Sequence, residues 1–392
     1  MSDRPKLVFI TSRFPYPLEK GDKLRAFHFI KGLSTSYEIT LIALTDQSIA
    51  DEWLNELAPF VVQTHVFKLS KPKQIFRLGL NFFLHAPFQV AYFTESKVKR
   101  QINQILKNLK PDHIYCQLIR AAEYVKNYHD CYKTLDYMDA LSKGMERRME
   151  NAPFYAKFIY RMEATRLREY ERRIFNYFEF HTMISLQDTY YIAHPEQTKI
   201  KVVPNGIDTQ FFSPMDSVHK EFDLVFVGNL SYAPNVDAMV WFEKNVLQKN
   251  KDLRILIAGA SPSQKILQLQ KRNSHIVVEG WQADIRHAYA RGKTFIAPMQ
   301  MGTGLQNKLL EAMAMELPCI TTSLANDAIH ATENEQIFVC NNAGEMATQI
   351  RLLQKDLSLA ASTGKAGRKF VESNYSWARC VEELNTIFRI QH

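Results

Sequence analysis

The chain has 392 residues, of which 46% are hydrophobic and 12% aromatic. Because a single core stops growing near about 250 residues, we expect a globular protein of two domains and exclude a disordered chain. There is no apolar run of about 18 residues and no signal-peptide pattern, so we expect a cytoplasmic protein without a membrane span. The five cysteines lack CxxC spacing, which fits a reducing cytosol and predicts no metal site.

The formal net charge of +8 comes entirely from the first half of the chain. Residues 1–205 carry 30 Lys and Arg against 22 Asp and Glu, whereas residues 206–392 carry 19 of each. A basic surface attracts nucleic acids or anionic lipid headgroups, and charge alone does not choose between them. A mildly basic, solvated surface is the alternative.

The first half of the chain begins as a βαβ unit. The apolar run 7–10 predicts a strand, residues 23–33 a helix and residues 39–44 a second strand. Residues 140–180 are rich in Arg, Glu and aromatics at helical spacing, which predicts one or two long helices. Further strands are predicted at 113–116, 133–135, 182–185 and 201–203.

The second half repeats this rhythm after the motif VVPNGID at 202–208, whose Asn-Gly turn marks a domain boundary. Alternating strands and helices predict a parallel, doubly wound sheet. We therefore predict domains at 1–205 and 206–375, and a last helix within 376–392 that either caps the second domain or crosses back to the first. The predicted strands are 223–228, 253–258, 275–278, 294–297 and 318–321, with a helix at 305–315.

Residues 301–315, MGTGLQNKLLEAMAM, place two glycines between a strand and a helix. Gly302 and Gly304 let the backbone approach a phosphate, and the N–H groups of the first helical turn favour negative charge. Lys308 and Glu311 fall on one helix face. Lys308 suits a diphosphate and Glu311 suits a ribose diol, since a carboxylate accepts two hydrogen bonds. A turn followed by an ordinary surface ion pair is the alternative.

Four segments carry a resemblance that covers most of the chain. They are TSRFPYPLEKGDKLRAFHFIKGL at 11–33, VPNGIDTQFFSP at 203–214, VFVGNLSYAPNVDAMVWF at 225–242 and GTGLQNKLLEAMAMELPCITT at 302–322. In these the sequence resembles the retaining family-4 glycosyltransferases of GT-B architecture, particularly bacterial exopolysaccharide-type sugar transferases. The resemblance implies an α/β fold of two doubly wound Rossmann-like domains facing a cleft, the first for the acceptor and the second for the donor.

The resemblance also implies a reaction. A sugar would pass from a nucleotide-diphosphate donor to a glycan or lipid-linked acceptor with retention, in surface or exopolysaccharide biosynthesis. No dedicated nucleophile, metal or cofactor is expected, because the leaving diphosphate takes the acceptor proton and the protein stabilises its charge. Lys308 and Asp139 are the catalytic candidates.

Residue by residue, Glu311 matches the second glutamate of the family's E-x7-E pattern, which holds the donor ribose. Thr303 stands where the first glutamate would help hold the donor sugar. Many relatives also place an Arg and a Lys on the diphosphate where this chain has Asn229 and Asn235. The missing positive charge must come from elsewhere, and Lys308 is the nearest candidate. Possible helpers from the first domain are Arg13, Lys20 and Lys23.

Further donor contacts are implied at the ends of several predicted strands. Gly21 would approach the donor phosphate, with a plain loop glycine as the alternative, and Trp281 would lie at the nucleobase, with a core position as the alternative. Asp136 and Asp139 follow a predicted strand and would contact the acceptor or the sugar. The remaining donor-binding candidates are Gly228, Asn229, Val278, Gly302, Thr303, Gly304, Leu305 and Gln306.

Three other functions compete with this prediction. A nucleotide-sugar 2-epimerase would share the architecture, and a non-catalytic nucleotide-sugar-binding subunit would accommodate Thr303. A nucleic-acid-binding protein is suggested by the basic residues within 147–173, but Glu and Arg alternate there as on a solvated helix. We therefore expect no nucleic-acid partner.

The segment 68–88 suggests an anionic membrane surface as a partner. Lys68, Lys71, Lys73 and Arg77 stand beside an aromatic cluster that includes Phe82 and Phe83. Basic residues beside aromatics suit peripheral attachment at the inner face of a membrane. A buried helix of the first domain with solvated lysines is the alternative.

Overall fold

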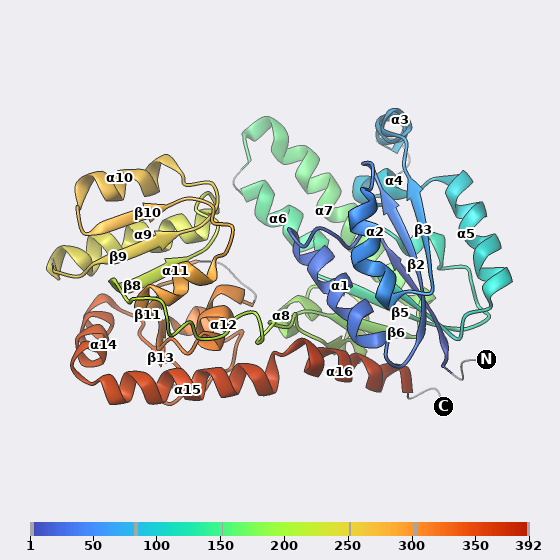
Figure 1. The fold of residues 1–392 in the computed structure, drawn as a ribbon. Helices are drawn as coiled ribbons and strands as arrows, with labels where there is room; N and C mark the ends of the chain where they lie inside the picture. The colour runs from blue at the N-terminus through green and yellow to red at the C-terminus, as the bar shows by residue number, and fades with distance from the viewer. Residues whose placement is uncertain (1–3, 82–84, 151, 251, 302–304, 390–392) are drawn as a thin grey trace. The chain divides into compact units, whose positions relative to one another are not determined.

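The computed structural model describes residues 4–81, 85–150, 152–250, 252–301 and 305–389. The chain divides into two compact units, and the last helix belongs mostly to the first of them (Figure 1). Residues 1–205 with 380–392 form the first unit, and residues 206–379 form the second.

The first unit is built on a seven-stranded parallel sheet with the order β3-β2-β1-β4-β5-β6-β7. The order reverses between β1 and β4, so the sheet is doubly wound. Its strands are β1 Lys6–Thr11, β2 Glu38–Thr45, β3 Gln63–Lys68, β4 His113–Gln117, β5 Tyr132–Met138, β6 Phe180–Met183 and β7 Lys201–Val202.

The helices of this unit lie between its strands along the chain, except for α16, which is the last element of the chain and lies mostly in this unit. They are α1 Gly21–Leu33, α2 Asp51–Leu57, α3 Lys71–Asn81, α4 Phe88–Phe93, α5 Ser96–Leu109, α6 Leu141–Glu150, α7 Phe154–Ile174, α8 Leu186–Thr189 and α16 Trp377–Arg389. Short 3-10 turns lie at Ala58–Phe60, Ala122–Tyr124, Phe175–Tyr177 and Gln197–Lys199. The long helices predicted within 140–180 are α6 and α7.

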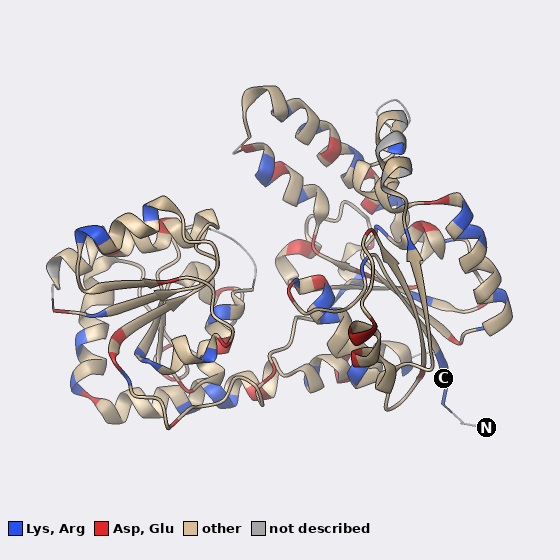
Figure 2. Ribbon diagram, turned by 45° about the horizontal axis from the view of Figure 1, so that its top comes forward, with Lys and Arg blue, Asp and Glu red and all other residues tan. Residues whose placement is uncertain are grey.

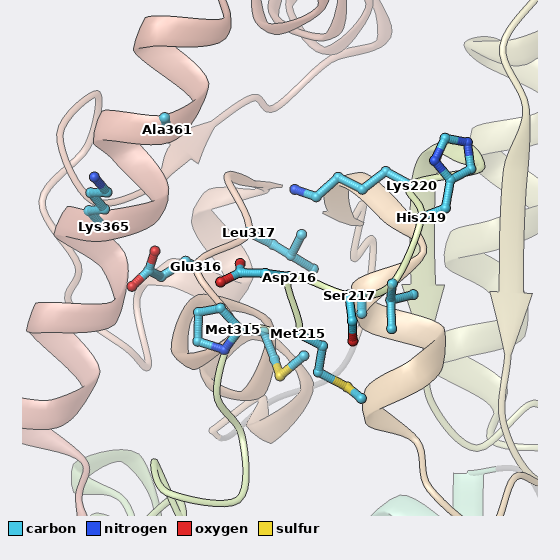
Figure 3. Close-up of a pocket in the computed structure, with 13 residues that line it drawn as sticks. Met215, Asp216, Ser217, His219, Lys220, Met315, Glu316, Leu317, Ala361 and Lys365 are labelled. Atoms are coloured by element: carbon cyan, nitrogen blue, oxygen red, sulfur yellow. The ribbon is translucent and has the colours of Figure 1, made fainter.

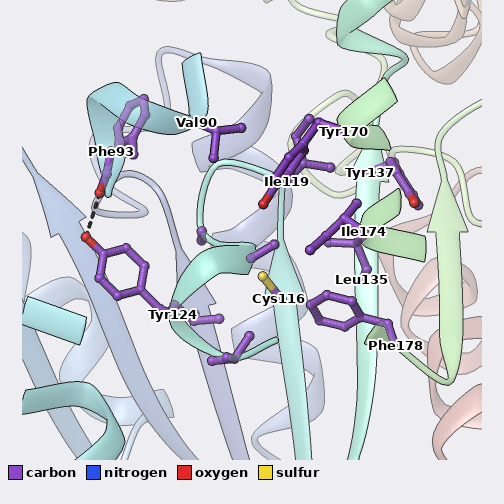
Figure 4. Close-up of a cluster of buried hydrophobic side chains, with 14 of the residues drawn as sticks. Val90, Phe93, Cys116, Ile119, Tyr124, Leu135, Tyr137, Tyr170, Ile174 and Phe178 are labelled. Atoms are coloured by element: carbon purple, nitrogen blue, oxygen red, sulfur yellow. Dashed lines mark hydrogen bonds between the residues drawn. The ribbon is translucent and has the colours of Figure 1, made fainter. Parts of the chain in front are cut away.

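Apolar side chains from β4, β5 and α7 form the core beneath one face of this sheet (Figure 4). Cys116 and Leu135 are fully buried there beside Ile174. The Tyr124 hydroxyl donates a hydrogen bond to the Phe93 carbonyl oxygen at 2.6 Å, which satisfies a polar group that would otherwise be costly to bury.

The second unit is a six-stranded parallel sheet with the order β10-β9-β8-β11-β12-β13, which reverses between β8 and β11. Its strands are β8 Phe222–Val227, β9 Ile255–Ala258, β10 Ile276–Glu279, β11 Gly292–Ala297, β12 Cys319–Thr321 and β13 Phe338–Val339. Its helices are α9 Ala233–Asn245, α10 Gln264–Arg272, α11 Arg286–Ala290, α12 Asn307–Ala314, α13 Ser323–Asn326, α14 Ala343–Lys355 and α15 Leu357–Asn374, with a 3-10 turn at Leu247–Lys249.

The two parallel sheets confirm the predicted fold class of two Rossmann-like domains. The sequence analysis missed β3 and β13. β3 is an edge strand whose side chains are exposed or half-buried, and β13 has two residues, so neither produces a buried apolar run.

A buried ion pair ties α1 to the sheet of the first unit. Arg25 in α1 is fully buried, and its Nε donates to Asp136 Oδ2 in β5 at 2.7 Å. The same guanidinium donates through Nη1 to the Pro204 carbonyl oxygen and to Asn205 Oδ1, each at 3.1 Å. Residues 204–205, at the end of the segment 1–205, are therefore held to α1 and, through Asp136, to β5.

We expect Arg25→Met to lower the free energy of unfolding by about 3–5 kcal/mol, because it leaves the Asp136 carboxylate buried without its counter-ion. Urea denaturation followed by circular dichroism measures this loss. Arg13→Met is the control, since Arg13 pairs with Asp22 at 2.6 Å but is partly exposed, and it should change stability much less. Equal losses in the two variants would contradict a special role for the buried pair.

Candidate functional site

The candidate site lies at the carboxyl edge of the second sheet, where the strand order reverses between β8 and β11. Ligands of doubly wound sheets bind at such a switch point. The chain leaves β8 at Gly228 and Asn229, and after β11 it leads to Leu305 and Gln306, directly before α12. Gly302, Thr303 and Gly304 lie outside the described residues.

Lys308, in the first turn of α12, reaches toward the loop that follows β8. Its Nζ donates a hydrogen bond to Asn235 Oδ1 in α9 and lies 5.2 Å from the centre of the Phe226 ring. Burial lowers the pKa of Lys308 to about 8, although the charge of Glu311 opposes this shift. A cation held in a poorly solvated place gains by meeting an anion, so Lys308 is suited to bind a phosphate.

Asn235 links Lys308 to the backbone that follows β8. Its Nδ2 donates to the Asn229 carbonyl oxygen at 2.9 Å, so the polar chain runs from Lys308 through Asn235 to Asn229. A Cβ atom on Gly228 would lie 2.8 Å from Asn235 Nδ2. A larger residue at 228 would therefore force the Asn235 amide to shift and disturb this polar chain.

Glu311 lies one turn after Lys308 on α12 and is held by a tyrosine. The Tyr289 hydroxyl donates to Glu311 Oε2 at 2.6 Å. Part of Glu311 remains open to solvent, but protein closely surrounds its carboxyl group. That burial raises the pKa of Glu311, while the Tyr289 hydrogen bond and the Lys308 charge oppose the rise. Within the described residues Oε1 makes no hydrogen bond, so it can accept one from a ligand.

The other predicted donor residues occupy distinct positions. The Val278 N–H already donates to Gln270 Oε1 at 2.6 Å. Trp281 is 74% exposed just beyond β10, so the alternative of a core position is wrong. Gly21 begins α1 in the first unit, where an added Cβ would meet nothing within 4 Å. The structure thus gathers Gly228, Asn229, Lys308 and Glu311 in one unit and leaves Gly21 in the other.

Asp136 does not contact an acceptor, and the expectation that it could is wrong. It is fully buried and, besides its pairing with Arg25, it accepts hydrogen bonds from the Tyr115 hydroxyl at 2.6 Å and from Thr182 Oγ1 at 2.9 Å. Both carboxylate oxygens of Asp136 are therefore hydrogen-bonded to residues within the first unit. Asp136 is therefore a structural residue.

Asp139, just beyond the end of β5, differs from Asp136 because it is an exposed residue. Protein atoms crowd its carboxyl group, and this desolvation, followed by the nearby charges of Asp188 and Asp136, raises the pKa of Asp139 to about 6. A carboxyl group that titrates near neutral pH at the carboxyl edge of a parallel sheet is suited to a ligand hydroxyl.

Two residues at these edges were missed from the sequence. Tyr289 lies in the short helix α11, and no local sequence pattern predicts its hydrogen bond to Glu311. Arg120 follows β4, and burial, followed by the charge of Arg13, lowers the pKa of Arg120 to about 10. Its position after a predicted strand was the signal that could have found it.

A cavity of the second unit lies away from this site (Figure 3). It has a volume of about 630 Å³ and is lined by the segment before β8, the end of α11, the turn after α12 and part of α15. Those segments lead into the amino ends of the strands. Asp216, Lys220, Glu316 and Lys365 therefore line the sheet edge opposite to Gly228.

Charged residues are spread over both units (Figure 2). Within the described residues, no three His, Cys, Asp or Glu side chains are placed to hold a metal ion. Among the described helices, none combines the length and the apolar character needed to cross a bilayer.

Part of the second unit matches a known protein family. Residues 221–356 match the family model described as "Glycosyl transferases group 1". An uncharacterized 44.6 kDa protein in the cps region of Klebsiella pneumoniae is 22% identical over 94% of this chain and 96% of its own length. The capsular polysaccharide biosynthesis glycosyltransferase CapM of Staphylococcus aureus is 23% identical over 44% of this chain and 47% of its own length.

Solved structures agree with the fold. Anabaena HepE, in a complex with UDP and glucose, superposes with a TM-score of 0.64 at 12% identity, covering 98% of this chain and 100% of that one. The chain therefore shares its two-unit fold with that structure, and residues 221–356 in its second unit match the model of group 1 glycosyl transferases.

We expect Glu311→Gln to weaken the binding of a nucleoside diphosphate by about 10- to 100-fold, because a ribose hydroxyl loses a charged acceptor worth about 1.5–3 kcal/mol. Isothermal titration with UDP, GDP and ADP measures this. Glu316→Gln is the matched control, since Glu316 lies in the cavity at the opposite sheet edge and should leave affinity unchanged. Unchanged affinity in Glu311→Gln would show that Glu311 only anchors Tyr289.

Proposed function

We propose that the protein transfers a sugar from a nucleotide-diphosphate donor to a glycan or lipid-linked acceptor, with retention of configuration, in surface or exopolysaccharide biosynthesis. The observation that carries the proposal is the placement of Lys308 and Glu311 together at the switch point of a group 1 glycosyltransferase domain. The relatives named for a cps region and for capsular polysaccharide biosynthesis support the polysaccharide context.

On the donor side, Lys308 and the amides at the start of α12 would stabilise the diphosphate as it leaves. The bond between the sugar C1 and the phosphate oxygen breaks, and the bond from C1 to the acceptor oxygen forms on the same face. The acceptor's proton passes to the departing diphosphate, so the protein needs no nucleophile, metal or cofactor. Glu311 would hold the ribose, and the exposed ring of Trp281 would stack on the nucleobase.

On the acceptor side, we propose that Asp139 accepts a hydrogen bond from the acceptor hydroxyl. It is exposed at the carboxyl edge of the first sheet, and with a pKa of about 6 it is still mostly ionised at neutral pH but becomes protonated in mild acid. A positioned hydroxyl near the sugar C1 contributes through orientation, which is worth several orders of magnitude in well-aligned reactions.

The direct test is a screen of nucleotide sugars by thermal shift, followed by product analysis with oligosaccharide and lipid-linked acceptors in the presence of a chelator. Retention requires that the anomeric configuration, read by NMR, be the same in product and donor. Inversion at C2 of the donor without an acceptor would indicate a 2-epimerase instead. Donor binding without turnover would indicate a non-catalytic subunit.

Lys308 gives the donor step a pH dependence. Because its pKa in the free protein is about 8, Lys308 is charged below that pH and loses its charge as the pH rises. Affinity for a nucleoside diphosphate should therefore fall as the pH rises through 8 and beyond, and Lys308→Met should bind more weakly but without this fall. Affinity for the nucleoside alone should change little. A wild-type profile that is flat to high pH would contradict the assignment.

Asp139 should make the transfer rate fall at acid pH, a decline that we call the acid limb of the pH profile. Its carboxylate is ionised above about pH 6, so the transfer rate should decline as the pH falls through 6, while Asp139→Asn should lose most transfer and lack this limb. Asp188→Asn is the diagnostic control, because removing that neighbouring charge should move the limb to lower pH with little loss of rate. An identical acid limb in Asp139→Asn would exclude Asp139 as its source.

A further inference from the structure

The beginning of α7 presents apolar side chains to solvent. Phe154 is 87% exposed, Tyr155 73%, Phe158 66% and Ile159 50%. We call these four residues the α7 patch. A helix on the surface of a globular protein usually turns charged and polar residues outward, so this stretch of α7 has the opposite pattern.

The orientation of α7 is fixed by its other face. The Glu163 carboxylate accepts hydrogen bonds from the Phe88 N–H at 2.8 Å and from the Gln89 N–H at 3.0 Å, at the start of α4. Leu167 is fully buried in the core and follows Phe158 by about two and a half turns, which places it on the opposite side of the helix. The patch therefore cannot be buried by rotating the helix.

Positive charge accompanies the α7 patch. Lys157 and Arg161 are exposed beside it on α7, and Arg148 is exposed on α6, which packs alongside α7 (Figure 1). Over residues 141–161 the sequence contains five Lys and Arg against two Glu. Anionic headgroups would attract all three of these cations, whereas Lys157 is of a residue type that is depleted at protein–protein interfaces.

We infer that the α7 patch docks on the surface of an anionic lipid bilayer. The rings of Phe154 and Phe158 would enter the boundary between headgroups and acyl chains, while Lys157 and Arg161 meet anionic headgroups. This surface is separate from the segment 68–88 suggested by the sequence. There Phe82 and Phe83 lie outside the described residues, and Arg77 pairs with Glu95 within the first unit at 3.1 Å.

The inference goes beyond the proposed sugar transfer, and it is tested without any activity. Full-length protein is sedimented at low salt with vesicles of phosphatidylcholine alone and of phosphatidylcholine with phosphatidylglycerol. Wild-type protein should sediment with the anionic vesicles only and be released as salt rises. Phe154→Ser with Phe158→Ser should lower the bound fraction at least tenfold.

Two further variants complete the experiment. Leu352→Ser with Leu357→Ser removes two exposed leucines from the second unit and should leave vesicle binding unchanged. Lys157→Glu with Arg161→Glu keeps the aromatics and should also abolish binding to anionic vesicles, so the test stands even if the phenylalanine variant folds poorly. Thermal unfolding and nucleoside diphosphate binding report the fold of each variant.

Several results would overturn the inference. They are wild-type protein that stays in the supernatant with anionic vesicles, binding that survives in both patch variants, and binding that the Leu352 and Leu357 variant loses equally. Concentration-dependent self-association that the phenylalanine variant abolishes, without vesicle binding, would show that the patch contacts a second copy of the chain. A failure of donor turnover bears on the proposed function alone.

Discussion

The first unit depends on the burial of one ion pair, between Arg25 and Asp136. Removing two charges from water is costly, and the cost is offset only when every remaining donor and acceptor is matched. Here α1, β4, β5, β6 and the residues at 204–205 all contribute to that matching. The pair therefore sets where the helix and the strands meet, and with them the edge at which Asp139 and Arg120 stand.

The second unit uses buried charge differently. Lys308 and Glu311 are each partly removed from water. Each can still form further hydrogen bonds to a ligand. The lysine has a neutral amide as its hydrogen-bond partner, and the glutamate has a neutral hydroxyl. These neutral partners orient the two side chains, and only the charges of Lys308 and Glu311 themselves offset each other, which suits residues that bind a ligand of opposite charge or a diol. Arg25 and Asp136, in contrast, neutralise each other.

The sequence was sufficient where structure follows from local pattern. Buried apolar runs located the central strands, and glycines between a strand and a helix located the switch point of the second sheet. It was insufficient where a distant partner decides the outcome. Asp136 and Asp139 stand three residues apart, both beyond the apolar run that predicted the strand, and nothing local distinguishes them. The difference comes from a distant residue, because the partner of Asp136 is Arg25 in α1. The same holds for Tyr289, whose bond to Glu311 joins two helices, and for the direction in which the α7 aromatics face.

The contact between Gly228 and Gly259 limits how the candidate site can vary. Gly259 has a φ of 142°, and a Cβ atom placed there would lie 1.8 Å from the Gly228 carbonyl oxygen. No side-chain rearrangement relieves a clash with backbone. A residue larger than glycine at 259 is therefore excluded both by the backbone conformation there and by the close contact with Gly228. Libraries that aim to change donor preference should keep both glycines. They have more freedom at Trp281, whose exposed ring is not required to fill the core.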